Sequence, residues 1–205
     1  MKRLTLDYSD SLDERSNGTL MLNMKEEERE FLASLAAALV QHPRATLKEL
    51  AQAIGVSKAT LYRFCKTREE LIQRLAEHGV GALNAAIEKA DLKVTAISKG
   101  LRNLLENLFE HREITSFLMI YWKDLHVSQD VEDGWTASLD EYFLRGQQQG
   151  IYRIDISAIE LTEIFISLVL GMVDAEQRGR VARAGLVLLT EKAFLSGAGN
   201  HISDL

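Results

Sequence analysis

The side chains between residues 57 and 66 combine positive charge with hydroxyl groups, which is the chemistry needed to hold and read a polyanion. Lys58 and Arg63 are long enough to reach base edges in a DNA groove, and an arginine can pair bidentately with guanine. Short or stiff hydroxyl side chains bond to phosphate oxygens, and the Thr60 methyl group can also touch a thymine methyl. The candidate DNA contacts are Thr46, Ser57, Lys58, Thr60, Tyr62, Arg63 and Lys66.

Two short helices are needed to position these side chains, and the local sequence predicts both. Thr46 can cap a helix whose apolar face comprises residues 47, 50, 51 and 54, and Gly55 has the backbone freedom to end it. Ser57 can cap a second helix over residues 58–66. Two helices joined by a short glycine-containing turn are typical of a helix-turn-helix, in which the second is the recognition helix.

Charge is distributed unevenly along the chain. The total of −6 would by itself disfavour a nucleic-acid partner, because phosphates repel anions. Residues 41–74, however, contain seven basic side chains against three acidic ones and sum to +4, whereas residues 1–40 sum to −3 and residues 75–205 to −7. A basic module on an acidic body is typical of a local DNA-binding surface.

The rest of the sequence predicts an all-α fold of about nine helices. Pro43 is the only proline, and no region is rich in strand-forming residues. We expect a flexible arm over residues 1–24, a helix-turn-helix DNA-binding domain over 25–70 and a larger helical body over 71–205. The first expected helix begins at residue 25. The others cover residues 46–54, 58–66, 67–90, 94–110, 113–124, 135–149, 157–178 and 181–194.

Several classes of protein are disfavoured by what the sequence lacks. The first residues have no apolar signal-peptide core, and no stretch reaches the roughly 18 apolar residues of a membrane helix, so a cytoplasmic protein is expected. The single cysteine, Cys65, predicts neither an intrachain disulfide nor a metal cluster. The five histidines form no metalloprotease pair, and there is no nucleophile elbow or phosphate-binding glycine loop. We therefore expect no enzyme activity and no cofactor.

The last two expected helices are too apolar to have one solvated side each. Residues 157–178 are hydrophobic almost all round, so they need cover on more than one side, and residues 181–194 are their natural mate. A four-helix interface with a second copy would supply that cover, and a two-fold dimer would read two half-sites. The alternative is that both helices form only the monomer's core. The expected interface residues are Phe165, Leu168, Val169, Met172, Leu186, Leu189 and Ala193.

The helix-turn-helix region resembles the DNA-reading signature of the TetR family of one-component bacterial repressors. The matching positions are Gly55, Val56, Ser57, Lys58, Thr60, Leu61, Tyr62, Lys66, Glu69, Glu70 and Leu71. Ala59 and Cys65 depart from the residues common in the family but are small or apolar enough for a packed helix. The resemblance implies a dimeric repressor that binds operator DNA, with a body that holds a small-molecule effector.

Residues 63–68, 143–156 and 171–180 are similar to NfxB-type repressors, the TetR-family proteins that silence multidrug efflux operons. This implies control of a pump by hydrophobic or cationic compounds. Helices of the body in the family line an apolar cavity, which gives as effector-pocket candidates Phe109, Phe117, Met119, Tyr121, Trp122, Trp135, Phe143 and Met172. A filled aromatic core is the alternative for these residues. The carboxylates that could balance a cation are Glu106, Glu110, Glu141 and Glu163.

Two other functions fit the same residues. Cys65 on the recognition helix would allow a redox-responsive regulator if its thiol were exposed and its pKa low. A helical adaptor, or a protein that binds DNA without reading sequence, would also fit, and the latter would show the same salt-dependent affinity for every DNA sequence.

Overall fold

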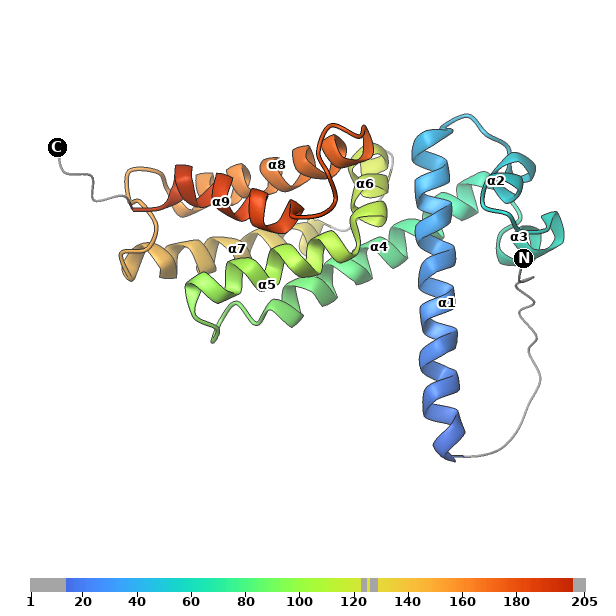
Figure 1. Cartoon of the computed structure of the whole chain (residues 1–205), viewed down its shortest axis with the longest axis horizontal. Coiled ribbons are helices and arrows are strands. Elements are labelled where there is room, and N and C mark those ends of the chain that lie inside the picture. The colour runs from blue at the N-terminus through green and yellow to red at the C-terminus, as the bar shows by residue number, and fades with distance from the viewer. Residues whose placement is uncertain (1–13, 123–124, 126–128, 201–205) are drawn as a thin grey trace. The chain divides into compact units, whose positions relative to one another are not determined.

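The structure is a computed structural model that describes residues 14–122, 125 and 129–200. Within these residues the chain forms nine α-helices and no strand of a sheet, which confirms the predicted all-α fold (Figure 1). Contacts divide the chain into two compact units, Met1–Leu75 and Ala76–Leu205. The helices are α1 (Glu14–Gln41), α2 (Leu47–Ala53), α3 (Lys58–Phe64), α4 (Arg68–Ala90), α5 (Ile97–Glu110), α6 (Arg112–Tyr121), α7 (Gln129–Gln148), α8 (Ala158–Gln177) and α9 (Leu186–Ala198).

The first unit contains α1, α2, α3 and the start of α4. Thr46 and Glu49 form a capping box at the start of α2, and the Ser57 side chain accepts a hydrogen bond from the Thr60 backbone N–H at the start of α3. Gly55, with φ of +74°, makes the turn between them in the left-handed region that favours glycine. The predicted caps and the predicted turn are therefore confirmed.

Three helices begin five or more residues away from their predicted starts. Helix α1 begins at Glu14 rather than residue 25, since residues 14–24 contain no proline to stop it, and only residues 1–13 of the predicted arm lie outside the described residues. Helix α7 begins at Gln129 rather than residue 135. Helix α9 begins at Leu186 because Gly185, with φ of +84°, stands at its N-terminus.

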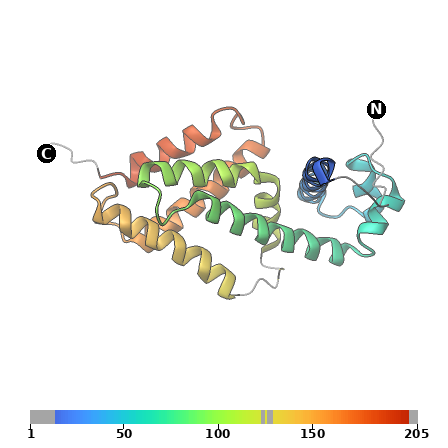
Figure 2. The ribbon, with the colours of Figure 1, turned by 90° about the horizontal axis from the view of Figure 1, so that it is seen from below.

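The second unit packs α5 to α9 and most of α4 around one apolar core. Contacts join α7 to α8, α5 to α9, α6 to α8 and α8 to α9, and α8 and α9 lie side by side in Figure 1. Seen from below, α5 lies between α4 and α9 (Figure 2). Four buried rings, those of Phe143, Tyr152, Phe165 and Phe194, contact one another at centroid distances of 5.3–6.2 Å. Among the described residues, no helix is both long and apolar enough to cross a membrane.

Candidate functional site

Helix α3 is held by one apolar side, which leaves its other side to present charge. Leu61 is fully buried, and the Phe64 ring meets the Phe31 ring edge to face at a centroid distance of 5.4 Å. The Arg74 guanidinium lies 5.1 Å from the centroid of the Phe64 ring and forms an ion pair with Glu70. Leu61 is therefore a core residue, and Phe64 is half-buried.

The cationic side chains of the recognition helix are exposed. Lys58, Arg63 and Lys66 all face solvent. The Lys58 ammonium lies 5.0 Å from the centroid of the half-buried Tyr62 ring, a cation–π contact that orients both side chains. Lys66 Nζ donates a hydrogen bond of 2.6 Å to the Tyr62 carbonyl, which ties that lysine to the end of the helix. Arg63 has no ion pair among the described residues and keeps its full reach.

The hydroxyl groups of Thr46, Ser57 and Thr60 make hydrogen bonds at the starts of α2 and α3. Thr46 Oγ1 donates to the Glu49 carboxylate at 2.8 Å and accepts from the Glu49 backbone N–H. The pKa of Glu49 is lowered, first because the Thr46 backbone N–H donates to its carboxylate. The hydroxyl groups of Ser57 and Thr60 lie 2.8 Å apart, within hydrogen-bonding distance. The hydroxyl groups of Thr46 and Ser57 cap the N-termini of α2 and α3. A hydrogen bond from one of them to a DNA phosphate would therefore be made in addition to its capping hydrogen bond or in place of it.

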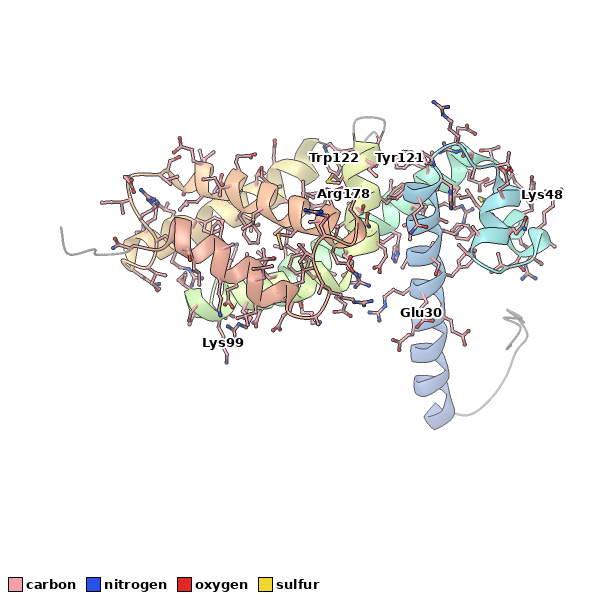
Figure 3. The ribbon with its side chains drawn as sticks, turned by 45° about the horizontal axis from the view of Figure 1, so that its top comes forward. Glu30, Lys48, Lys99, Tyr121, Trp122 and Arg178 are labelled. Carbon is pink, nitrogen blue, oxygen red and sulfur yellow. The ribbon has the colours of Figure 1, made fainter. Side chains whose placement is uncertain are left out.

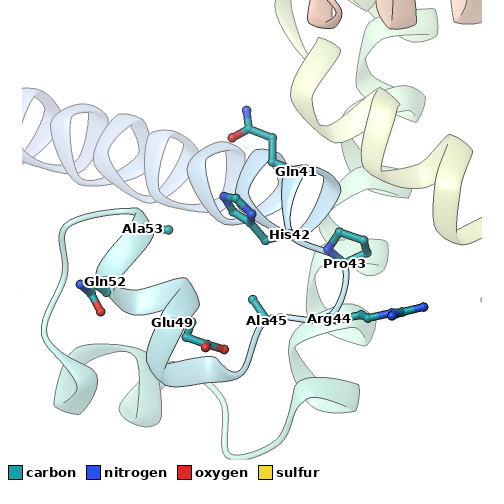
Figure 4. A pocket seen from close by; sticks show the side chains of 8 residues that line it. All are labelled: Gln41, His42, Pro43, Arg44, Ala45, Glu49, Gln52 and Ala53. Carbon is teal, nitrogen blue, oxygen red and sulfur yellow. The ribbon is translucent and has the colours of Figure 1, made fainter.

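An open groove of about 790 Å³ lies between the end of α1 and α2 (Figure 4). His42, Pro43 and Arg44 line it on one side, and Glu49 and Gln52 on the other, while the Arg44 side chain points away from α2. Lys48, labelled in Figure 3, belongs to α2 but does not line the groove. Among the described residues that line the groove, Glu49 supplies the only carboxylate, which is already used in the capping box.

Cys65 does not have the properties of a redox sensor. Its side chain is 1% exposed, and its thiol donates to the Leu61 carbonyl. Burial, followed by the nearby charge of Glu70, raises the pKa of the Cys65 thiol. A reactive cysteine needs an exposed thiolate of low pKa, so the site does not favour the redox alternative.

A cavity of about 390 Å³ lies within the second unit, and its size suits a small organic ligand. Five helices contribute to its wall, from α4 to α8. The indole rings of Trp122, which directly follows α6 (Figure 3), and Trp135 on α7 lie 5.8 Å apart between centroids. Trp135 Nε1 donates a hydrogen bond to the Asn84 side chain on α4. The lining residues are Leu83, Ile87, Leu104, Leu108, Thr115, Leu118, Met119, Trp122, Trp135, Thr136, Leu139, Glu163, Phe165, Ile166, Val169 and Leu170.

Only some of the predicted effector-pocket residues lie at this cavity. Met119, Trp122 and Trp135 line it, and Glu163 is the one carboxylate among the described residues of its wall. The others do not line it. The Phe117 and Tyr121 rings stack on each other at 4.9 Å, and Phe143 packs in the aromatic cluster of the core. Four of the predicted residues are therefore buried elsewhere: Phe109, Phe117, Tyr121 and Phe143. Met172 is partly buried against the same core. The aliphatic lining residues of α4 and α5 were missed, since nothing in their sequence pattern separates them from ordinary core positions.

The predicted interface residues fall into two groups. Phe165, Val169 and Leu186 are buried within the protomer, where they belong to the inner sides of α8 and α9. Leu189 is 48% exposed, Ala193 is exposed, and Leu168 and Met172 are half-buried. Two apolar residues that the prediction omitted, Ile164 and Leu188, are 46% and 48% exposed.

Comparison with known proteins relates the chain to bacterial regulators. It is 46% identical over 177 residues to the HTH-type transcriptional regulator NfxB of Pseudomonas aeruginosa, an alignment that covers 84% of this chain and 95% of NfxB. It is also 33% identical over 90 residues to the HTH-type transcriptional repressor LfrR of Mycolicibacterium smegmatis, which covers 44% of this chain and 48% of LfrR. No protein-family model matches the chain.

Two solved structures have the same fold. The TetR-like regulator LfrR in complex with proflavine superposes with a TM-score of 0.58 and 25% identity, covering 88% of this chain and 99% of LfrR. The TetR-family regulator PfmR of Thermus thermophilus superposes with a TM-score of 0.62 and 22% identity, covering 81% of this chain and 97% of PfmR. The relatives are transcriptional regulators rather than enzymes. With 46% identity to NfxB over most of its length and the helical fold of LfrR and PfmR, this chain belongs to the TetR family of helix-turn-helix transcriptional regulators.

Proposed function

We propose that this protein is a ligand-responsive repressor that binds a palindromic operator as a homodimer and is released from it by a small hydrophobic or cationic effector. The regulated genes encode an efflux system. The relation to NfxB and to the repressor LfrR supports this assignment, and the complex of LfrR with proflavine supports an effector of this kind.

The observation that carries the proposal is that the cavity wall includes α4. Leu83 and Ile87 of α4 line the cavity, and the first turns of the same helix belong to the unit that contains the recognition helix. Helix α6 also approaches α4 closely. A Cβ atom at Gly79 would lie 2.9 Å from Leu118 Cδ1, and Leu118 is itself a lining residue.

The proposed mechanism is a shift between two populations. An effector in the cavity changes the packing of residues 67–90 on the body, and the two recognition helices of the dimer lose the spacing that the operator requires. A ligand does this only if it binds the DNA-incompetent state more tightly. Equal effector affinity for free protein and for protein bound to operator would overturn this mechanism.

Operator binding is tested by electrophoretic mobility shift with the DNA upstream of the protein's own gene and random DNA as competitor. Lys58→Ala and Arg63→Ala are each expected to weaken specific binding about tenfold, because each removes an exposed cation able to contact DNA. The matched control is Lys99→Ala, which removes an exposed lysine of the second unit and should leave binding unchanged.

The alternatives give different results in the same assay. If random DNA competes the mobility shift away and the protein binds every DNA sequence with equal affinity, the nonspecific DNA-binding alternative is supported. Absence of any shift at low salt would support a helical adaptor. Loss of operator binding after mild peroxide, abolished by Cys65→Ala, would support the redox alternative.

The contact between α6 and α4 is tested by Gly79→Ala. The added methyl group must displace Ile114 and Leu118, and the open side available to Leu118 is the cavity that it lines. We expect the protein to remain folded and its effector affinity to fall about tenfold, because the cavity becomes smaller. Proflavine binding is measured by isothermal titration calorimetry.

The control for this variant is Gly81→Ala on the same helix. A Cβ atom at Gly81 has nothing within 4 Å, so alanine there is expected to stabilise α4 by about 0.5–1 kcal/mol without changing effector affinity. Wild-type effector affinity in Gly79→Ala would show that Leu118 does not couple the two helices to the cavity.

A further inference from the structure

One wall residue of the cavity carries a negative charge without a partner. Among the residues whose side chains the structure describes, Glu163 on α8 is the only carboxylate that lines the cavity, and no lysine, arginine or histidine of that part of the chain lines it. Among the residues whose side chains the structure describes, Glu163 forms neither an ion pair nor a hydrogen bond. By contrast, the three other carboxylates singled out from the sequence, those of Glu106, Glu110 and Glu141, do not line the cavity. Within the described part of the wall, the Glu163 charge is therefore not balanced by a cation.

The neighbouring polar groups already use their protons within the protein. Thr115 Oγ1 donates to the His111 carbonyl at 3.1 Å, and Thr136 Oγ1 donates to the Asp133 carbonyl at 3.1 Å. The Trp135 indole N–H donates to Asn84. An anionic ligand would meet the Glu163 carboxylate and find these donors occupied, whereas a cation with N–H groups would meet an acceptor.

The two tryptophans add a preference for flat, positively charged rings. Trp122 and Trp135 are tilted by 41° to each other across the wall, and an indole face attracts a cation more strongly than any other side chain ring. The rest of the wall is mostly aliphatic, which suits the unsubstituted part of an aromatic ligand.

We propose that the cavity selects planar aromatic cations and that Glu163 is the residue that sets this charge preference. The inference rests on the proposed effector-binding function and names the ligand class that the site takes. Because Glu163 is solvent-exposed, water screens its charge, and the expected preference is about tenfold rather than several hundredfold.

Three tricyclic probes of similar size separate charge from shape: the cation proflavine, the neutral acridone and the anion anthracene carboxylate. Affinity is measured by calorimetry and by quenching of intrinsic fluorescence, which reports on the cavity because the only two tryptophans of the chain line it. The wild type is expected to bind proflavine about tenfold more tightly than acridone and to bind the anion most weakly.

Glu163→Gln keeps the shape of the side chain and removes its charge. We expect it to bind proflavine about tenfold more weakly and acridone as tightly as the wild type does. Glu163→Lys should reverse the order, so that the anion binds more tightly than proflavine. Glu106→Gln removes an exposed carboxylate outside the cavity and should change none of the three affinities.

The outcomes distinguish this inference from the proposed function. Equal binding of all three probes by the wild type, or wild-type proflavine affinity in Glu163→Gln, would overturn the role of Glu163 and leave an effector cavity without charge selection. If none of the probes binds, the proposed effector cavity itself is overturned, and this inference with it. Operator binding, measured separately, is unaffected by either result.

Discussion

Replacing Gly146 with alanine is expected to destabilise the helical body by about 3 kcal/mol or more, at the upper end of the cost of overpacking a core. A Cβ atom at Gly146 would lie 2.2 Å from Cδ2 and 2.5 Å from Cε2 of the Tyr152 ring. Either the fully buried ring or the backbone of α7 must move. Urea unfolding followed by far-ultraviolet circular dichroism measures the loss as a lower transition midpoint.

The Tyr152 ring has little freedom to move away. It packs edge to face against Phe143 at 5.3 Å and against Tyr142 at 6.2 Å, and the hydroxyl oxygens of the two tyrosines lie 3.2 Å apart. Burial is also the main reason that the pKa of Tyr142 is raised to about 12, as expected for a phenol shielded from water. The Tyr152 backbone N–H donates to the Gly146 carbonyl, so the ring and the glycine are joined by a tight turn.

Gly134→Ala on the same helix is the matched control. A Cβ atom there has nothing within 4 Å, so the same substitution should raise stability by about 0.5–1 kcal/mol through higher helix propensity. The two variants therefore differ in the sign of their effect. An unchanged midpoint for Gly146→Ala would mean that the aromatic cluster tolerates an added methyl group.

The features that sequence predicted well depend on residues close together in the chain. Thr46 and Ser57 cap their helices because an N-cap hydroxyl needs only a backbone N–H two or three residues later. Gly55 adopts a positive φ of 74° and was identifiable from its place after an apolar helix face. The recognition helix, and with it the cations at residues 58, 63 and 66, could therefore be placed from local sequence alone.

The features that sequence did not predict depend on contacts between distant segments. Nothing around Gly146 indicates that a ring six residues later packs on its Cα atom. Phe117 and Trp122 belong to α6 and its C-cap, and Phe143 and Trp135 belong to α7, but of these four residues only the two tryptophans line the cavity. An aromatic residue on a helix lines a cavity or fills a core according to which helices surround it, and that arrangement is a property of the tertiary packing.

The packing of helix α8 was predictable from the sequence only in part. Its apolar composition predicted cover on more than one side, and the structure does bury Phe165 and Val169 while leaving Ile164 46% exposed. The pattern could not tell which residues face inward, because a helix that is hydrophobic all round has no polar side to fix its orientation. The residues left exposed on α8 and α9 are therefore those on which we expect the second protomer to pack.

Leu189→Arg is expected to convert the protein to a monomer and to weaken operator binding at least about a hundredfold. Leu188 and Leu189 on α9 are each 48% exposed, and Ala193 one turn later is exposed as well. In a two-fold dimer through this surface, an arginine at 189 is buried in both protomers without a partner, which costs far more than the lost apolar contact. Size-exclusion chromatography with light scattering gives the mass, and mobility shift gives the operator affinity.

Loss of the dimer affects DNA binding because the two recognition helices then bind independently. Joining two half-site contacts in one molecule raises the overall affinity by about two to four orders of magnitude without any new contact, and a monomer forfeits that gain. Val94→Arg is the control: Val94 is 76% exposed in the loop between α4 and α5, so a charge there should leave both mass and affinity unchanged. A dimeric Leu189→Arg variant with wild-type operator affinity would show that the protomers meet elsewhere, and the exposed leucines of α9 would then need another partner.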